Sequence, residues 1–192
     1  MHHETSPVDF VIQLKTAPVG LVEHWCLDIA QHALYRGADR LKKAKFQQAI
    51  DLRRLELLDG VIQKDIIDIR KPLLRSVSHY QKNADTKTYS DAVRSILAAV
   101  FDDPRTQIGP VYGPHLTGAS YWAVRSATSG TPTIPPDMDS EMVVLEKAWQ
   151  RDRFDFLLDY ASKTSRFWML YQEPKKLPFP VPENCRLDYF GP

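Results

Sequence analysis

Apolar residues recur at intervals of three or four along much of this chain, the spacing that puts them on one face of a helix. Residues 19–37 show the pattern clearly, with Trp25 and Ile29 on the apolar stripe. The same spacing continues through residues 38–60 and 61–80. We therefore expect a run of helices in the first half of the chain, the first of them with one buried face.

Two local signals interrupt this run. Asp59 and Gly60 form a pair that ends or bends a helix, because glycine favours chain reversal over helix. Pro72 lies inside residues 61–80, where it removes a backbone donor and disfavours helix at the residue before it. We expect a kink there, or two short helices in place of one.

Two further helices have recognisable starts. Ser90 is a favourable N-cap for residues 91–101, whose amphipathic pattern is the cleanest in the chain. Asp139 or Ser140 is placed to cap a helix over residues 142–164. The sequence therefore predicts helices both before and after the middle of the chain.

The helix predicted over residues 142–164 has apolar side chains on more than one face. Leu145 and Trp149 share one stripe, while Phe154 and Leu157 belong to another. A helix with two apolar faces contacts two neighbours. We expect both Leu145 and Trp149 to be buried.

Residues 104–136 have a different texture, because they hold six of the fourteen prolines and four of the eight glycines. We expect this segment to be mostly loop. Within it, residues 118–127 favour a short helix or strand. The aromatic pair Tyr121 and Trp122 would anchor that segment to the core.

The C-terminal residues 174–192 are rich in proline, which supplies no backbone donor for regular pairing. We expect them to run as an extended tail across the surface of a neighbouring protein. Aromatic side chains are the natural anchors of such a tail. Those predicted to contact the partner are Phe179, Tyr189 and Phe190.

These patterns predict a mainly α fold, built as a bundle or as a short α-solenoid. A single helical domain would occupy residues 1–173, with an irregular N-terminus and the loop 104–136, followed by the tail 174–192. No apolar run approaches the roughly 20 residues that a membrane-spanning helix needs. The first residues also lack the basic and apolar regions of a secretory signal.

Charge is nearly balanced over the whole chain, with 25 Lys and Arg against 24 Asp and Glu. Residues 36–54 nevertheless hold seven basic residues against two acidic ones, while residues 137–159 hold seven acidic against three basic. The basic stretch would contact either an acidic protein or the phosphates of a nucleic acid. Its predicted partner-binding residues are Arg40, Lys42, Lys43 and Lys45, and the basic pattern continues at Arg70, Lys71, Arg75 and Lys82.

His24, Asp28 and His32 recur every four residues, so a helix would project them from nearly the same side. Two imidazoles and a carboxylate suit zinc or iron, which makes a metal-dependent enzyme one alternative. Such sites draw further ligands from another segment, and none is evident. The interpretation we favour is a solvated polar line opposite the Trp25 and Ile29 stripe, with no metal or cofactor.

Other reactive groups give weaker signals. Asp137 and Asp139 form an Asp-x-Asp pair of the kind that holds a divalent cation beside a phosphate, although helix capping accounts for both. His115 in the central loop is interpreted as a surface residue rather than an acid–base catalyst. Cys26 and Cys185 lie 159 positions apart and form neither a disulfide framework nor a zinc motif. We expect free thiols in a reducing compartment, with one bridge between them as the alternative.

The sequence therefore favours a non-catalytic subunit of a larger assembly, held by its helices and its tail. An accessory subunit of an organellar respiratory or ATP-synthesising complex and a viral coat or connector subunit both fit this description. The alternatives are a nucleic-acid-binding helical protein that uses residues 36–54 and a metal-dependent enzyme. The expected location is intracellular, in either the cytoplasm or an organelle matrix.

Overall fold

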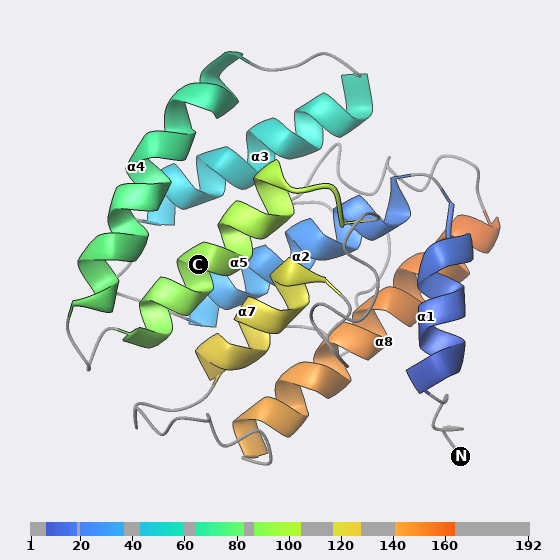
Figure 1. The fold of residues 1–192 in the computed structure, drawn as a ribbon. Coiled ribbons are helices and arrows are strands. Elements are labelled where there is room, and N and C mark those ends of the chain that lie inside the picture. Colours follow the sequence, from blue (N-terminus) through green and yellow to red (C-terminus); the bar gives the residue numbers. More distant parts are fainter. Residues whose placement is uncertain are drawn as a thin grey trace.

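One helix, α2 (Leu21–Arg36), lies at the centre of the molecule and contacts at least four others (Figure 1). The computed structural model describes residues 7–18, 20–36, 43–59, 64–82, 87–104, 117–127 and 141–163. Within these ranges the regular secondary structure is helical and no strand occurs, so the predicted mainly α fold is confirmed. The other helices are α1 (Pro7–Thr16), α3 (Lys43–Asp59), α4 (Lys64–Gln81), α5 (Lys87–Phe101), α7 (Gly118–Ala127) and α8 (Glu141–Lys163).

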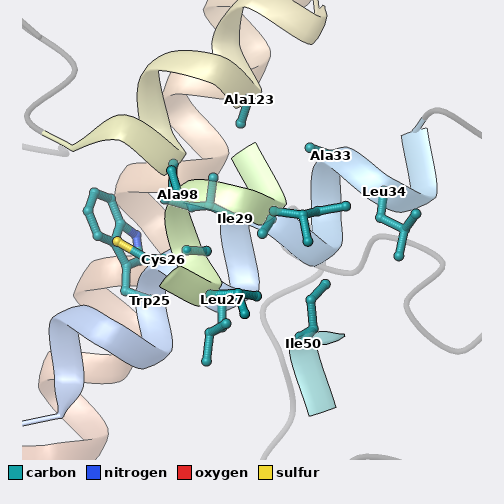
Figure 2. Close-up of a cluster of buried hydrophobic side chains, with 14 of the residues drawn as sticks. Trp25, Cys26, Leu27, Ile29, Ala33, Leu34, Ile50, Ala98 and Ala123 are labelled. Carbon is teal, nitrogen blue, oxygen red and sulfur yellow. The ribbon is translucent and has the colours of Figure 1, made fainter. Parts of the chain in front are cut away.

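The sequence pattern indicated that this first long helix would be buried on one face. In the structure, helix α2 is buried on every side. Leu27 and Ile29 are two residues apart and so point to nearly opposite sides of the helix, about 200° apart, yet both are fully buried (Figure 2). The reason is that α3, α5, α7 and α8 all pack against α2. The buried residues of α2 consequently include four polar ones, His24, Asp28, Gln31 and His32.

Helices α5 and α7 form the most extensive helix pair. Their buried alanines, among them Ala99 on α5 and Ala123 on α7, leave room for the two backbones to approach. The hydroxyl of Ser95 donates a hydrogen bond to the carbonyl of Ala119 over 2.8 Å. This side-chain bond joins α5 to the first turn of α7.

Helix α7 starts at a side-chain cap. The hydroxyl oxygen of Thr117 accepts a hydrogen bond from the backbone N–H of Ser120 over 3.2 Å, which satisfies one of the donors left free at a helix start. The segment that favoured either a short helix or a strand is therefore a helix. It lies between α5 and α8 in Figure 1.

Helix α1 replaces the irregular N-terminus that the sequence indicated. Phe10 of α1 packs edge-on against Trp25 and Phe154, with ring centroids 5.9 and 5.1 Å apart, and these two rings are themselves 5.5 Å apart. Edge-to-face contacts of this kind stabilise beyond the area they bury. The three rings therefore bind α1 to α2 and α8.

A sharp turn connects α1 to α2. Gly20 has a φ of 85°, a left-handed conformation that residues other than glycine disfavour because of their Cβ atom. The N–H of Leu21 donates to the carbonyl of Pro18 over 3.1 Å, and this bond closes the turn. The turn lets α1 fold back onto the helix that follows it.

Helix α4 lies at the edge of the molecule and packs against α3 and α5 (Figure 1). It runs as one helix through Pro72, so two short helices, one of the two outcomes that the sequence predicted, do not occur. Pro72 and the residue one turn before it, Asp68, are both exposed. Water can therefore bind the Asp68 carbonyl that Pro72, which has no N–H, leaves without a helical donor.

Ser90 is not the N-cap that the sequence predicted, because α5 begins earlier, at Lys87. The side chain is buried, and its hydroxyl donates to the carbonyl of Val77 over 3.4 Å. A residue interpreted as a local helix signal instead joins α5 to α4.

The prediction for α8 was half right. Trp149 is 4% exposed and belongs to the core, whereas Leu145 is 56% exposed. The buried stripe of α8 passes through Glu146, Gln150 and Arg153, three polar residues that hydrophobic periodicity does not reveal. Leu145 lies off that stripe, so burial in the core was the wrong prediction for it.

The tail 174–192 lies outside the described residues, and so does most of the loop 104–136. None of the helices within the described ranges is long and apolar enough to cross a membrane.

Replacing Trp149 with alanine should lower the free energy of unfolding by about 3–5 kcal/mol, because a large buried ring is lost and a cavity remains. Replacing Leu145 with alanine on the same helix is the matched control, and its effect should stay within about 0.5 kcal/mol. Urea denaturation of both variants gives the comparison. Equal effects of the two changes would contradict the burial described here.

Candidate functional site

The line formed by His24, Asp28 and His32 is buried, so the prediction of a solvated polar line was wrong. The three residues are 1%, 1% and 4% exposed. They lie inside the molecule because α3 and α8 cover the side of α2 from which they project. Burial makes the partners of these groups decisive, since a buried charge without a partner costs several kcal/mol.

Asp28 is held between two arginines from two other helices. Its Oδ1 accepts a hydrogen bond from Nη2 of Arg54 on α3 over 2.8 Å, and its Oδ2 accepts one from Nε of Arg153 on α8 over 2.6 Å. All three side chains are at most 5% exposed. The carboxylate therefore links α2, α3 and α8 through two charge-assisted hydrogen bonds, which are among the strongest in proteins.

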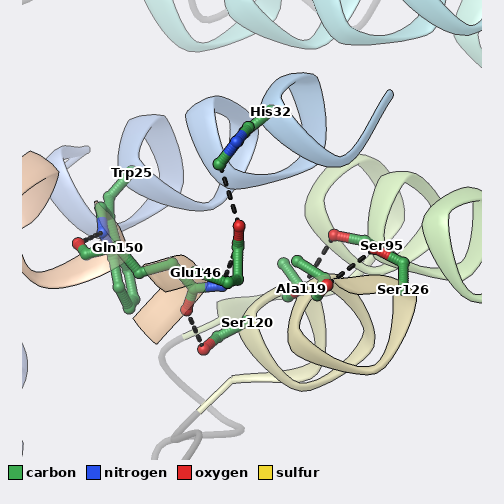
Figure 3. Close-up of polar contacts among 9 residues, drawn as sticks. Trp25, His32, Ser95, Ala119, Ser120, Ser126, Glu146 and Gln150 are labelled. Carbon is green, nitrogen blue, oxygen red and sulfur yellow. Dashed lines mark hydrogen bonds and ion pairs between the residues drawn. The ribbon is translucent and has the colours of Figure 1, made fainter. Parts of the chain in front are cut away.

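His32 begins a second buried polar chain between α2 and α8 (Figure 3). Its Nδ1 lies 3.1 Å from Oε2 of Glu146, and the other oxygen of Glu146 accepts a hydrogen bond from the Gln150 amide over 2.6 Å. Gln150 in turn accepts a bond from the hydroxyl of Ser120 on α7 over 2.5 Å. The ring of His32 also packs on Trp149, with centroids 4.0 Å apart. This chain joins three helices.

The backbone of α8 takes part in the same contact. The indole N–H of Trp25 donates to the carbonyl of Gln150 over 2.8 Å (Figure 3). Gln150 thus joins α8 to α2 through its main chain, and to α7 through its side chain.

His24 is neutral at ordinary pH. Burial is the largest cause that lowers its pKa to about 3, and the positive charge of Arg54 adds to the effect, while Asp28 opposes it. A group with this pKa does not exchange protons near neutrality, as a general acid or base must.

Cys26 is a free and buried thiol. Burial is the main cause that raises its pKa to about 12, against the weaker opposing effect of a hydrogen bond from Sγ to the Thr117 hydroxyl at 3.7 Å. The thiolate is the reactive form of cysteine. The thiol of Cys26 therefore behaves as a small apolar core group.

The arrangement does not favour a metal centre on α2. Both carboxylate oxygens of Asp28 face guanidinium groups, whose positive charge opposes a cation at the same place. No cluster of three or more potential metal-ligating side chains occurs in the described parts of the chain. Asp137, Asp139 and His115 lie outside those parts, as does Cys185.

Most of the predicted partner-binding residues lie outside the described residues. Lys45 is exposed on α3, and Lys43 stands in the first turn of that helix, where its side chain is not described. Outside the described ranges lie Arg40, Lys42, Phe179, Tyr189 and Phe190. Of the four predicted residues in the basic stretch, Lys45 is therefore the one whose side chain is described, and it lies at the surface.

A surface on α4 combines basic residues that the sequence analysis identified with two exposed aliphatic residues that it did not. Ile67 and Leu74 are 62% and 50% exposed, and they are seven residues apart, on one side of the helix. Exposed basic side chains flank them. We name this surface the α4 outer face, and its residues are Ile67, Arg70, Lys71, Leu74 and Arg75.

A signal for this surface was present in the sequence. The apolar stripe that α4 buries runs through Ile66, Leu73 and Val77, and Ile67 and Leu74 stand off that stripe. An aliphatic residue away from the core-facing stripe of an otherwise amphipathic helix is a surface residue. Two such residues seven positions apart lie on the same side.

Comparison with protein-family models, with curated proteins and with solved structures gave no match to this chain. Its function is therefore inferred from its own residues.

Replacing Asp28 with asparagine should destabilise the protein by about 3–5 kcal/mol, because two buried guanidinium groups would lose their shared negative charge. Asp155 pairs with Arg151 at the surface of α8, where its side chain is 52% exposed. Asparagine at position 155 is therefore the control, and should cost less than about 1 kcal/mol. Thermal and urea unfolding measure both. A mild effect at Asp28 would show that the cluster tolerates an unpaired charge.

The pKa of His24 predicts a dependence of stability on pH. The unfolded histidine, with a pKa near 6.5, takes up a proton as the pH falls, whereas the folded one does not until about pH 3. Stability should therefore be complete above pH 6.5 and decline below it, by roughly 2 kcal/mol between pH 7 and pH 5 from this residue.

Unfolding free energies of the His24→Gln variant at several pH values test this expectation. The variant should have a flatter profile than the unmodified protein over that range. His79 is exposed on α4, so His79→Gln is the control and should leave the profile unchanged. Parallel profiles for the unmodified protein and His24→Gln would mean that another group causes the decline.

Proposed function

We propose that this protein is a non-catalytic subunit of a larger assembly, and that the α4 outer face binds an acidic, amphipathic segment of a partner protein. The observation that carries the proposal is the exposure of Ile67 and Leu74 on one side of α4, between basic side chains. Single exposed apolar residues are common on proteins. Two at this spacing, bordered by cations, form a surface with a definite chemistry.

The apolar part of the surface favours a protein partner. Burying an exposed isoleucine or leucine side chain stabilises a complex by about 1.5–3 kcal/mol when the fit is close. Phosphates and sugars offer no comparable apolar surface, and nucleic-acid affinity depends chiefly on cations. Ile67 and Leu74 would therefore contribute little to RNA or DNA binding.

The charge of the surface favours an acidic partner. Arg70, Lys71 and Arg75 border the aliphatic pair, and among the described side chains of the same helix one exposed carboxylate, that of Asp68, lies nearby. Arg70 also lies over the ring of Phe101, 5.3 Å from its centroid, which holds its guanidinium close to α5. Complementary charge speeds encounter and selects the partner.

The interior supports a binding role over a catalytic one. Asp28 and Glu146 contact groups that join helices, and the thiol of Cys26 is kept protonated. Catalytic groups have pKa values near the working pH and reach the substrate. Here the shifted pKa values of His24 and Cys26 move away from neutrality, at positions inside the core.

The proposal includes the kinds of assembly that the sequence favours: an accessory subunit of an organellar respiratory or ATP-synthesising complex, or a viral coat or connector subunit. It also includes a role for the C-terminal tail, whose proposed anchors are Phe179, Tyr189 and Phe190. The proposed location is a reducing intracellular compartment, since the sequence has no disulfide framework. Each part is open to a separate test.

Site-specific photo-crosslinking tests the binding surface. A photoreactive amino acid at position 74 should capture a partner in cells, and one at position 12, where Ile12 is exposed on α1, should not capture the same protein. The captured protein is then purified. Its affinity should fall about tenfold or more for a variant with serine at positions 67 and 74, because two buried aliphatic contacts are lost.

Charge reversal separates the protein partner from a nucleic acid. Glutamate at positions 71 and 75 should weaken binding of the captured protein and make its affinity less sensitive to salt. The proposal fails if the chain instead binds RNA or DNA tightly, and if that binding depends on Lys71 and Arg75 but not on Ile67 and Leu74. It also fails if both surface variants bind the captured protein normally.

A further inference from the structure

A second surface, on α5 and α7, has two arginines around one tryptophan. The guanidinium of Arg94 lies over the ring of Trp122, 4.5 Å from its centroid, and that of Arg125 lies 5.4 Å from the same centroid. All three side chains are partly buried. Contacts of this kind between a cation and an aromatic face are attractive, and they fix the plane of the guanidinium.

Arg125 already has a carboxylate. Its Nε lies 3.3 Å from Oδ2 of Asp91, and its Nη1 donates to the Tyr121 hydroxyl over 3.2 Å. Burial, the largest single effect, would lower its pKa, but the Tyr121 hydrogen bond together with the charge and hydrogen bond of Asp91 raises the pKa overall. Arg125 is thus compensated by groups of α5 and α7.

Arg94 differs from the other partly or fully buried arginines that stack on rings. Arg125, Arg151 and Arg153 each pair with an aspartate. Within the described part of the chain, Arg94 has no carboxylate partner, and its buried Nε has no hydrogen-bond acceptor. The buried Nε is out of reach of a ligand, so the two terminal NH₂ groups of the oriented guanidinium are the donors that would bind an oxyanion in two-pronged geometry.

We propose that Arg94, held against Trp122, binds a carboxylate of an acidic peptide segment of a partner protein. The aromatic and arginine composition of the surface matches that of the residues that dominate binding energy in protein interfaces. Asp91 pairs with Arg125, so within the described residues the positive charge of Arg94 has no carboxylate to compensate it and is left for the ligand. The site does not depend on the α4 outer face, and so it stands or falls separately from the proposed function.

A peptide titration observed by NMR tests the site. The probe is a hexaglutamate peptide, with hexaglutamine as the uncharged counterpart and inorganic phosphate as a competing oxyanion. The indole N–H signal of Trp122, assigned by its loss in Trp122→Phe, should shift on addition of hexaglutamate and not of hexaglutamine. Arg94→Gln should weaken the binding by about tenfold or more, and Arg94→Lys should restore only part of it, because lysine lacks the planar fork.

Arg151→Gln is the matched control. Arg151 also lies over an aromatic ring, that of Phe10 at 4.0 Å, but it has Asp155 as its partner, so its loss should leave peptide affinity unchanged. Asp91→Asn should strengthen binding, because it removes the negative charge that lies beside Arg125 and repels an acidic ligand at the same surface. This second variant reports on the site even if Arg94→Gln destabilises the fold.

Three results would overturn the proposal. The first is the absence of a Trp122 shift at millimolar hexaglutamate. The second is equal affinity of the unmodified protein and a folded Arg94→Gln variant. The third is a site that binds inorganic phosphate and not hexaglutamate, which would identify a phosphate ligand in place of a carboxylate.

Discussion

The fold depends on one buried carboxylate, that of Asp28. Removing this group from water is unfavourable by several kcal/mol, and the loss is offset only when both of its oxygens face positive charge. Arg54 and Arg153 provide that charge from two different helices, so α3 and α8 cannot move away from α2 without exposing an uncompensated ion. Hydrophobic burial stabilises the core, and this ionic cluster selects one arrangement of its helices.

The sequence predicted the helices well and the polar interior poorly. Trp149 and Ile29 show the periodicity of a helix face, and both are in the core. Periodicity fails where a buried stripe is polar, as at Glu146, because it assigns polar residues to the surface. His24 was misplaced for the same reason. The partner of such a residue comes from a distant segment, and local spacing holds no information about that partner.

The candidate surfaces differ in composition from the polar interior. A polar residue inside the protein contacts another helix, whereas the aliphatic pair Ile67 and Leu74 remains outside with no described side chain over it. The interior thus holds groups usual in active sites, and the exterior holds groups usual in binding sites. This inversion is the ground on which we propose recognition rather than turnover.

The central position of α2 has a consequence for synthesis in the cell. Asp28 and Arg153 are 125 positions apart, so the ribosome makes the helix at the middle of the molecule long before the last helix that covers it. Until then, an aspartate and two histidines of α2 stay in water beside apolar side chains that have no cover. The nascent chain therefore exposes apolar segments of the kind that chaperones bind, and this ionic contact cannot form before α8 emerges.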